Sequence, residues 1–400
     1  MKEAPEDIID AVRGGDAGTL ETRLPQLEGA VDDYGSNGRP LVEWAAIEGK
    51  VESLQALLEA GSKPASMPGI LHTCIFSGWG QGPDVSMVEA LLDAGCDPNQ
   101  REKGDSGATP LYTAAMTAPF PRRAAAATKL LLARGADPRV RCGADTTPLH
   151  VAAAGISADT VQMLLEAGAD PSASDTRGRT PAHHCIRTYG ESRAHAEGDE
   201  DDDSVAVAVQ LIADNLTLLI EHGADLEVED TQGQTPLQGI VGLEGCPESI
   251  VALMLDGGAP ADVRIEVRED ALDLLAVATV QRYSDAMIVR LYEAGCPTDE
   301  TYAMFGGRCW LEIATLFEPH YGVALCRHSE AFAEHLAGHR TAKGTNMLAC
   351  AAVAGSRELV ELMQRQGLSP TEKNSEGHDA IDAAEANGHA ELAAYLSGSS

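Results

Sequence analysis

Apolar residues along this chain recur in short helical stripes that end at glycine and aspartate. The clearest copy runs from Thr147 to Arg179. Within it, Val161, Leu164 and Leu165 follow the i, i+3, i+4 spacing of a half-buried helix over 160–167. A run of small apolar residues before this stripe predicts a shorter helix that packs closely on its neighbours. The pattern therefore predicts a pair of helices as the structural unit.

Residues at the ends of this unit support the prediction. The Thr147 hydroxyl can cap the first helix, and Pro148 is compatible with a first helical position. Gly168 supplies the left-handed residue that ends the second helix. The stretches 170–171 and 175–178 combine aspartate with proline or glycine, which is typical of turns.

The unit repeats along the chain. The motif T-P-L-H-V-A at Thr147 returns as T-P-A-H-H-C at Thr180, 33 residues later. Further repeats are predicted to start near Pro40, Gly69, Thr109, Thr235, Asp270, Cys309, Asn346 and Asp379. Because a single helix pair cannot bury its apolar face, the copies are expected to stack.

In motif and period the chain resembles the ankyrin-repeat family. The resemblance implies an all-α solenoid of helix pairs with hairpin fingers, about ten repeats long and preceded by an N-terminal cap. We expect the cap at residues 1–38 and the array at 39–396, with a divergent repeat at 309–344 and a terminal capping repeat at 378–396. The resemblance also implies that fingers and inner helices line a concave binding face.

Four insertions are predicted as loops between the two helices of a pair, on the edge opposite the fingers: 78–84, 118–123, 188–203 and 318–329. Such an edge is a recurrent binding surface in repeat proteins. Four aromatic residues are expected to lie on this edge or beneath it, and plugging the local loop is the favoured role: Trp79, Phe120, Tyr189 and Tyr321. Asp199–Asp203 has the early carboxylates of a calcium loop, but Ser204 and Gln210 replace its glycine and final glutamate. We interpret this run as a solvated, mobile acidic loop, with an ion or partner site as the alternative.

The nine cysteines indicate buried thiols rather than disulfides or a metal site. Cys74, Cys185, Cys96 and Cys296 fall at repeat positions that hold small residues in the clearest copy, and there is no C-x-x-C pair. Three fall in predicted loops: Cys142, Cys246 and Cys326. We expect no bound metal and a reducing compartment.

No persuasive catalytic or cofactor-binding pattern occurs. The cluster of His183, His184, Cys185 and His195 resembles a ligand set, but His183 is the histidine of T-P-x-H and favours a structural role. The stretch 78–82 has the glycines of a phosphate loop without its spacing. We therefore predict a non-catalytic protein with no cofactor.

The net charge of the chain and its distribution limit the kinds of partner that the protein is expected to bind. The net charge of −33 disfavours nucleic acid and anionic membranes. Residues 97–195 nevertheless hold 12 basic and 10 acidic residues, whereas the rest of the chain holds 17 and 52. Six basic residues of this band fall in three successive predicted fingers and are our candidate partner-binding residues: Arg101, Lys103, Arg139, Arg141, Arg177 and Arg179. Glu227, Glu229 and Asp230 in a later finger reverse the sign, although simple solvation accounts for the charges equally well.

These observations predict a cytoplasmic, monomeric module that binds another protein on its finger and inner-helix face. The start of the chain lacks the apolar core of a signal peptide, and no run of about 18 apolar residues occurs. Three alternatives stay open. The protein could be an acidic immunity or antitoxin-like neutraliser of a basic toxin, a secreted bacterial effector, or an enzyme that uses the insertion edge.

Overall fold

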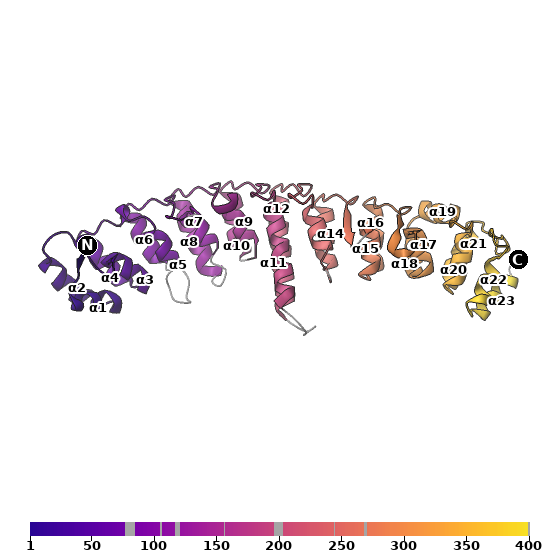
Figure 1. The fold of residues 1–400 in the computed structure, drawn as a ribbon, viewed down its shortest axis with the longest axis horizontal. Coiled ribbons are helices and arrows are strands. Elements are labelled where there is room, and N and C mark those ends of the chain that lie inside the picture. Colours follow the sequence, from indigo (N-terminus) through magenta and orange to yellow (C-terminus); the bar gives the residue numbers. More distant parts are fainter. Residues whose placement is uncertain are drawn as a thin grey trace. The chain divides into compact units, whose positions relative to one another are not determined.

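The protein is built from consecutive pairs of helices in two compact units, residues Met1–Pro236 and Leu237–Ser400. The computed structural model describes residues 1–76, 85–104, 106–116, 121–155, 157–195, 203–243, 245–267 and 270–398. Figure 1 labels the elements in chain order. The predicted helical repeat architecture is confirmed, with short strands added in some of the connections.

The first unit opens with a small N-terminal subassembly and continues with five helix pairs. Strand β1 lies parallel to β2, and β2 lies antiparallel to β3. The elements are β1 (Lys2–Glu3), α1 (Glu6–Gly14), α2 (Ala17–Arg23), η1 (Leu24–Gln26), η2 (Val31–Asp33), β2 (Tyr34–Ser36), β3 (Arg39–Pro40), α3 (Leu41–Glu48), α4 (Val51–Glu59), η3 (Pro64–Ser66), α5 (Ile70–Phe76), α6 (Val85–Asp93), α7 (Pro110–Ala115), α8 (Pro121–Ala133), η4 (Gly143–Asp145), α9 (Pro148–Ala153), α10 (Ala158–Glu166), α11 (Pro181–His195) and α12 (Asp203–Glu221).

The second unit continues the series and carries two antiparallel hairpins, β4–β5 and β6–β7. Helix α13 begins at the boundary between the units. The elements are α13 (Pro236–Val241), α14 (Glu248–Asp256), β4 (Arg264–Val267), β5 (Asp270–Asp273), α15 (Leu274–Val280), α16 (Asp285–Glu293), β6 (Thr301–Tyr302), η5 (Ala303–Phe305), β7 (Arg308–Cys309), α17 (Trp310–Leu316), α18 (Pro319–His328), α19 (Glu330–Gly338), α20 (Met347–Val353), α21 (Arg357–Arg365), α22 (Ala380–Ala386) and α23 (Ala390–Gly398).

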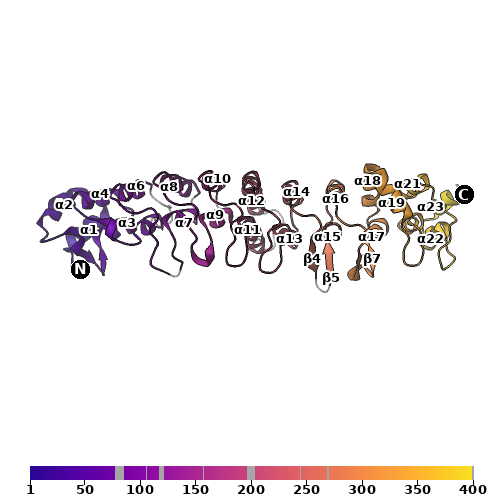
Figure 2. The ribbon, with the colours of Figure 1, turned by 90° about the horizontal axis from the view of Figure 1, so that it is seen from above.

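Within each unit the first helices of the pairs form one row and the second helices form another (Figure 2). We call these the inner and outer helices. Ala152 and Ala153 on inner helix α9 are fully buried, because small residues let neighbouring inner helices approach closely. Leu164 on outer helix α10 is also fully buried. The core is therefore a continuous apolar layer between the rows of each unit.

The predicted repeat starts are confirmed with one exception. Each inner helix begins one residue after its predicted start, except near Asp270. There the chain forms strand β5, and α15 begins after Asp273, whose carboxylate accepts a hydrogen bond from the Ala276 N–H. The sequence prediction missed this position because Asp270 and Asp273 are both acceptable helix caps.

The divergent repeat holds three helices, and here the loop prediction for 318–329 is wrong. Helix α18 occupies 319–328 and is the outer helix, with Pro319 in its first turn. Tyr321 is buried in it and donates a hydrogen bond to the Tyr283 carbonyl at 2.6 Å. The inserted element is α19, which follows the outer helix and is capped by the Ser329 hydroxyl. The insertion therefore lies on the side of the finger.

The insertion at 188–203 is also more helical than predicted. Helix α11 continues to His195, and α12 begins at Asp203. Figure 1 shows this pair reaching beyond its neighbours on the edge opposite the row of fingers, as predicted for the first unit. The segments 77–84, 117–120 and 196–202 lie outside the described residues, and so do the predicted roles of Trp79, Phe120 and the acidic run. The side chain of Tyr189 is likewise outside them.

All nine cysteines are buried and carry free thiols. Burial raises the pKa of the Cys96 thiol to about 11 and that of Cys326 to about 12. Cys326, which was predicted in a loop, lies inside α18. The prediction of buried thiols is confirmed, because a protonated, enclosed thiol packs as a small apolar side chain.

Candidate partner-binding surface

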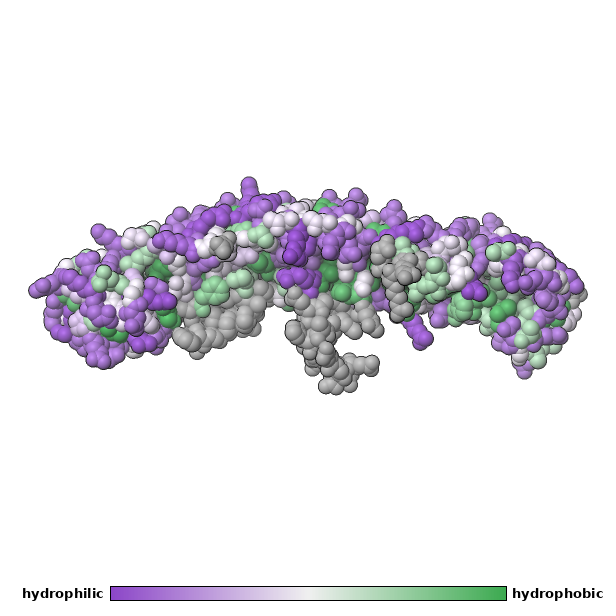
Figure 3. Space-filling view, in the orientation of Figure 1, coloured by the Kyte–Doolittle hydropathy of each residue, from purple (hydrophilic) through white to green (hydrophobic). Residues whose placement is uncertain are grey.

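The four consecutive fingers that follow α6 in the first unit each connect an outer helix to the next inner helix: residues 97–108, 137–146, 170–179 and 225–234. Their edge is mostly hydrophilic in the space-filling view (Figure 3). The first finger holds Arg101 and Lys103, the second Arg139 and Arg141, and the third Arg177 and Arg179. The six candidates thus lie in three consecutive fingers, as the sequence predicted.

Arg101 and Arg141 each join their own finger to the next one. The Arg101 guanidinium donates to the Gly107 carbonyl and to the Arg141 carbonyl, both at 2.9 Å. The Arg141 guanidinium donates to the Asp145 carbonyl at 3.4 Å and to the Ser174 carbonyl at 2.7 Å. Both side chains are held in place while much of each stays exposed.

Arg139 makes a similar link at a neighbouring position. Its Nε donates to the Gly168 carbonyl at 3.0 Å, in the turn that ends α10. Asn99 occupies the same position one finger earlier and donates from Nδ2 to the Gly135 carbonyl at 2.9 Å. These bonds satisfy carbonyls at helix ends that have no partner within the helix. The charged candidates therefore also stabilise the stacking of repeats.

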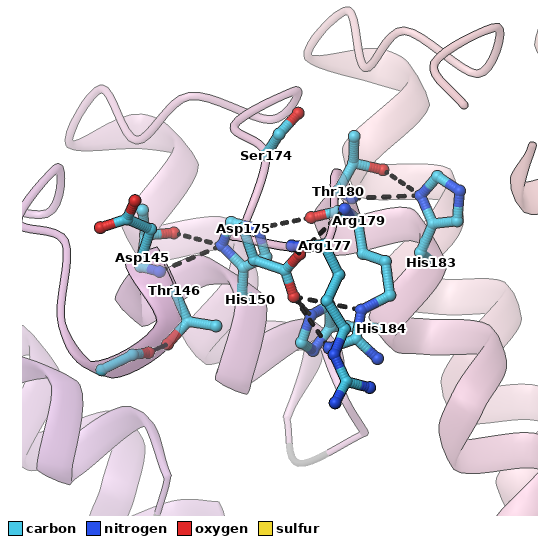
Figure 4. Close-up of polar contacts among 12 residues, drawn as sticks. Asp145, Thr146, His150, Ser174, Asp175, Arg177, Arg179, Thr180, His183 and His184 are labelled. Atoms are coloured by element: carbon cyan, nitrogen blue, oxygen red, sulfur yellow. Dashed lines mark hydrogen bonds and ion pairs between the residues drawn. The ribbon is translucent and has the colours of Figure 1, made fainter. Parts of the chain in front are cut away.

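Arg179 is engaged by the buried carboxylate of Asp175, whose side chain is inaccessible to solvent (Figure 4). Asp175 Oδ2 accepts from Arg179 Nη2 at 2.9 Å and from His184 Nε2 at 3.1 Å. Its Oδ1 accepts from the N–H groups of Arg177 at 2.7 Å and Arg179 at 3.0 Å. Burial by itself would raise the pKa of Asp175, but these bonds outweigh burial and hold the pKa far below its usual range. The sequence predicted only a turn here.

His184 is the uncharged side chain among the groups that contact Asp175. Burial and the neighbouring ring of His150, 5.0 Å away and edge-on, lower the pKa of His184 to about 4. Its Nε2 therefore donates to Asp175, and its buried Nδ1 has no partner within the described residues. The arrangement fixes the third finger and holds no nucleophile aligned with a base.

The T-P-x-H histidines link successive repeats, which confirms the structural role predicted for His183. His183 Nε2 donates to the Gln234 carbonyl at 2.9 Å, and its Nδ1 accepts from the Thr180 N–H at 3.1 Å. His150 makes the equivalent bonds to Arg179 and to Thr147. A carbonyl can only accept, so the contacts fix the tautomer of each ring.

Lys103 and Arg177 differ from the other candidates. Both side chains are exposed, and neither makes a hydrogen bond or an ion pair with any residue that the structure describes. The fourth finger exposes Glu227 and Glu229 instead. The finger edge of the first unit therefore changes from basic to acidic along the chain.

Acid should weaken the first unit through His184. The folded state lowers the pKa of this histidine from 6.5 to about 4, so its stabilising effect is complete above pH 6.5 and is lost as the pH falls toward 4. We expect a loss of about 3 kcal/mol across this range, at 1.36 kcal/mol per pKa unit. Urea unfolding of wild type and His184→Gln at pH 7 and pH 4.5 measures it. If the free energy of unfolding falls equally in the two proteins between pH 7 and pH 4.5, His184 is not the cause of the loss.

Comparison with known proteins identifies the repeats. The family model described as ankyrin repeats (3 copies) matches residues 71–175 and 122–194. The repeats in residues 71–194 belong to the ankyrin-repeat family. The match covers the repeats that carry the best T-P-x-H motifs and the three basic fingers. Ankyrin repeats are in general non-catalytic modules for protein–protein interaction.

This chain matches two relatives over only a small part of their own length. Rabankyrin-5 of Mus musculus is 32% identical over 168 residues, which are 42% of this chain and 11% of Rabankyrin-5. The E3 ubiquitin-protein ligase KEG of Arabidopsis thaliana is 23% identical over 347 residues, 72% of this chain and 19% of the ligase. A crystal structure of the ankyrin repeat domain of Bcl-3 aligns with a TM-score of 0.46 at 20% identity, covering 63% of this chain and 99% of that domain.

Across the described ranges, each helix is either too short or too polar to cross a bilayer. This agrees with the absence of a long apolar run in the sequence.

Proposed function

We propose that this ankyrin-repeat protein is a non-catalytic module that binds another protein through the finger edge of its first unit. The observation that carries the proposal is the row of fixed guanidinium groups on successive fingers. Arg101 reaches the Arg141 carbonyl, and Arg141 reaches the Ser174 carbonyl. Together with Arg177 and Arg179, these residues give each of three successive fingers a cation.

Fixing these side chains in advance favours binding. An arginine side chain that is ordered on association costs about 0.5–1.5 kcal/mol, and here the ordering is already done by backbone carbonyls. Arg101 uses two of its five N–H donors in its bonds to the Gly107 and Arg141 carbonyls. The remaining donors are available for carboxylates of a partner, in the bidentate geometry that arginine favours.

The change of sign along the edge suggests the charge pattern of the partner. An acidic region would face the fingers at 97–108, 137–146 and 170–179, and a basic region would face the finger at 225–234. Complementary charges of this kind mainly speed association and fix the orientation of the complex. The sequence hypothesis of a dipolar binding face is thus retained as our proposal.

The experiment is capture of a partner from native lysate followed by binding kinetics with Arg177→Glu. Arg177 is chosen because its side chain is exposed and makes no bond that holds the finger within the described structure. We expect slower association by roughly 10-fold at low salt and a smaller defect as salt screens the charge. The fold should be unchanged, because exposed substitutions usually shift stability by under about 0.5 kcal/mol.

The matched control is Lys129→Glu, which makes the same change of charge on the exposed side of outer helix α8. It alters the net charge of the protein equally but lies away from the fingers. Equal association rates for the two variants would show that net charge alone matters. The finger-edge proposal would then be wrong.

A second candidate function is neutralisation of a basic toxin domain, which the net charge of −33 favours. In that case the acidic surface as a whole would attract the basic toxin domain, which would not contact the basic fingers. Arg177→Glu would then speed association rather than slow it. We further propose a reducing compartment, the cytoplasm, as the place of action, supported by the nine free buried thiols.

A further inference from the structure

A cluster of three potential metal ligands lies in the second unit, apart from the fingers discussed above. Cys309, Glu312 and His339 each offer one donor atom, and the three atoms lie within 4.8 Å of one another. Cys309 Sγ is 3.4 Å from His339 Nε2, and the same Nε2 is 3.3 Å from Glu312 Oε1. One imidazole nitrogen therefore faces both the thiol and the carboxylate.

The repeat fold explains how this cluster arises. Cys309 and Glu312 occupy the positions of Thr147 and His150 in the clearest repeat. There the threonine hydroxyl lies 2.8 Å from the histidine Nδ1, because the cap and the third helical residue meet at a helix start. In the divergent repeat the same geometry brings a thiol and a carboxylate together. The inserted helix α19 then ends at His339, which completes the group.

Without a metal ion, the buried Glu312 carboxylate has few groups nearby that offset its lost hydration. This residue is only 9% exposed, and within the described residues its carboxylate accepts one long hydrogen bond, from His339 at 3.3 Å. A buried carboxylate requires a cation or several donors to offset its lost hydration. In the T-P-x-H repeats the residue at this position donates to the next repeat, which a glutamate side chain cannot do.

The spacing of the donor atoms fits a tetrahedral zinc ion. With Zn–S of about 2.3 Å and Zn–N and Zn–O of about 2.1 Å, tetrahedral angles place S and N about 3.6 Å apart and N and O about 3.4 Å apart. The two separations in the structure, 3.4 Å and 3.3 Å, are close to these values. A set of one thiolate, one imidazole and one carboxylate suits zinc and is unsuited to calcium or magnesium.

We propose that Cys309, Glu312 and His339 bind one zinc ion. The Cys309 thiol loses its proton to solvent on binding, and the thiolate sulfur, Glu312 Oε1 and His339 Nε2 become the three protein ligands. The His339 side chain is 21% exposed, so zinc can enter from solvent and water can take the fourth position. The ion would link the end of the inserted helix α19 to the start of α17. No C-x-x-C pair occurs in the chain, which is why a metal was not expected from the sequence.

The test uses the full chain without a histidine tag, stripped of metal and titrated with CoCl2 and then ZnCl2. We expect one cobalt per chain, with the absorption of a tetrahedral site and a thiolate-to-cobalt charge-transfer band that zinc abolishes. Zinc should raise the thermal midpoint of unfolding, and a chelator should reverse the shift. A folded chain that takes up no stoichiometric cobalt, or gives a spectrum without the thiolate band, would overturn the proposal.

Variants distinguish zinc binding at the three proposed ligands from adventitious binding elsewhere on the protein. His339→Ala and Cys309→Ser should each weaken zinc binding by more than about 10-fold, since even outer-shell partners contribute 10–100-fold. The matched control is His335→Ala, one turn earlier on α19, where the imidazole contacts the exposed Asp299 at 3.0 Å. Circular dichroism confirms that each variant is folded. If His339→Ala and His335→Ala bind zinc as tightly as wild type, the ion is held elsewhere and the proposal fails.

Discussion

Replacing Asp175 with alanine is expected to destabilise the first unit by about 3–5 kcal/mol, the usual cost of removing one partner from a buried charged network. The carboxylate is inaccessible to solvent and accepts bonds from the backbone of its finger, from Arg179 and from His184. Its loss leaves a guanidinium and an imidazole without their acceptor. Denaturant unfolding, followed by a probe in the middle repeats, measures the change.

The matched control is Asp230→Ala, one repeat later. Asp230 Oδ1 accepts from the N–H groups of Gln232 and Gln234, as Asp175 Oδ1 does in its own finger. Asp230 is only half-buried and has no ion pair among the described residues. We expect a smaller loss, about 1–3 kcal/mol for two neutral donors. Equal losses at the two positions would mean that the buried charge network adds nothing to stability.

Leu149→Ala is expected to cost about 2–5 kcal/mol, because it leaves a cavity in the best-formed repeat. Leu149 is fully buried on α9, between the neighbouring inner helices α7 and α11. Repeats couple mainly to their neighbours, so protection from hydrogen exchange should fall first in α7–α12. Helices α20–α23 should keep their protection under the same conditions.

Val207→Ala is the control for this variant. Val207 on α12 is 66% exposed, so its truncation should shift stability by under about 0.5 kcal/mol. Uniform loss of protection along the whole chain in Leu149→Ala would contradict the picture of a chain of locally coupled repeats.

Repeat boundaries were predictable because their signals are local. A threonine before a proline starts a helix, and Gly168 adopts the positive φ of 87° that ends one. The three-helix repeat was missed although its signals were present. Pro319 lies in the first turn of α18, and the Ser329 hydroxyl caps α19. These signals were outweighed by the expectation that an insertion forms a loop.

The charge of the candidate surface could be predicted from the sequence, but the hydrogen bonds that hold its arginine side chains could not. Arg101 and Arg141 stood out as cations, yet their acceptors are backbone carbonyls 40 and 33 residues away. Such contacts depend on how repeats stack and leave no trace in local sequence. The same limit applies to Cys309 and His339, which are 30 residues apart and meet only because an extra helix returns to the start of the repeat.

Hydrogen exchange of the free and partner-bound protein tests the central claim most directly. If the partner binds the finger edge of the first unit, amides in 97–104, 137–146 and 170–179 gain protection on binding. The far end of α11 and the beginning of α12, on the edge opposite the fingers, should exchange as in the free protein. Protection confined to that opposite edge, with the three fingers unchanged, would contradict the account.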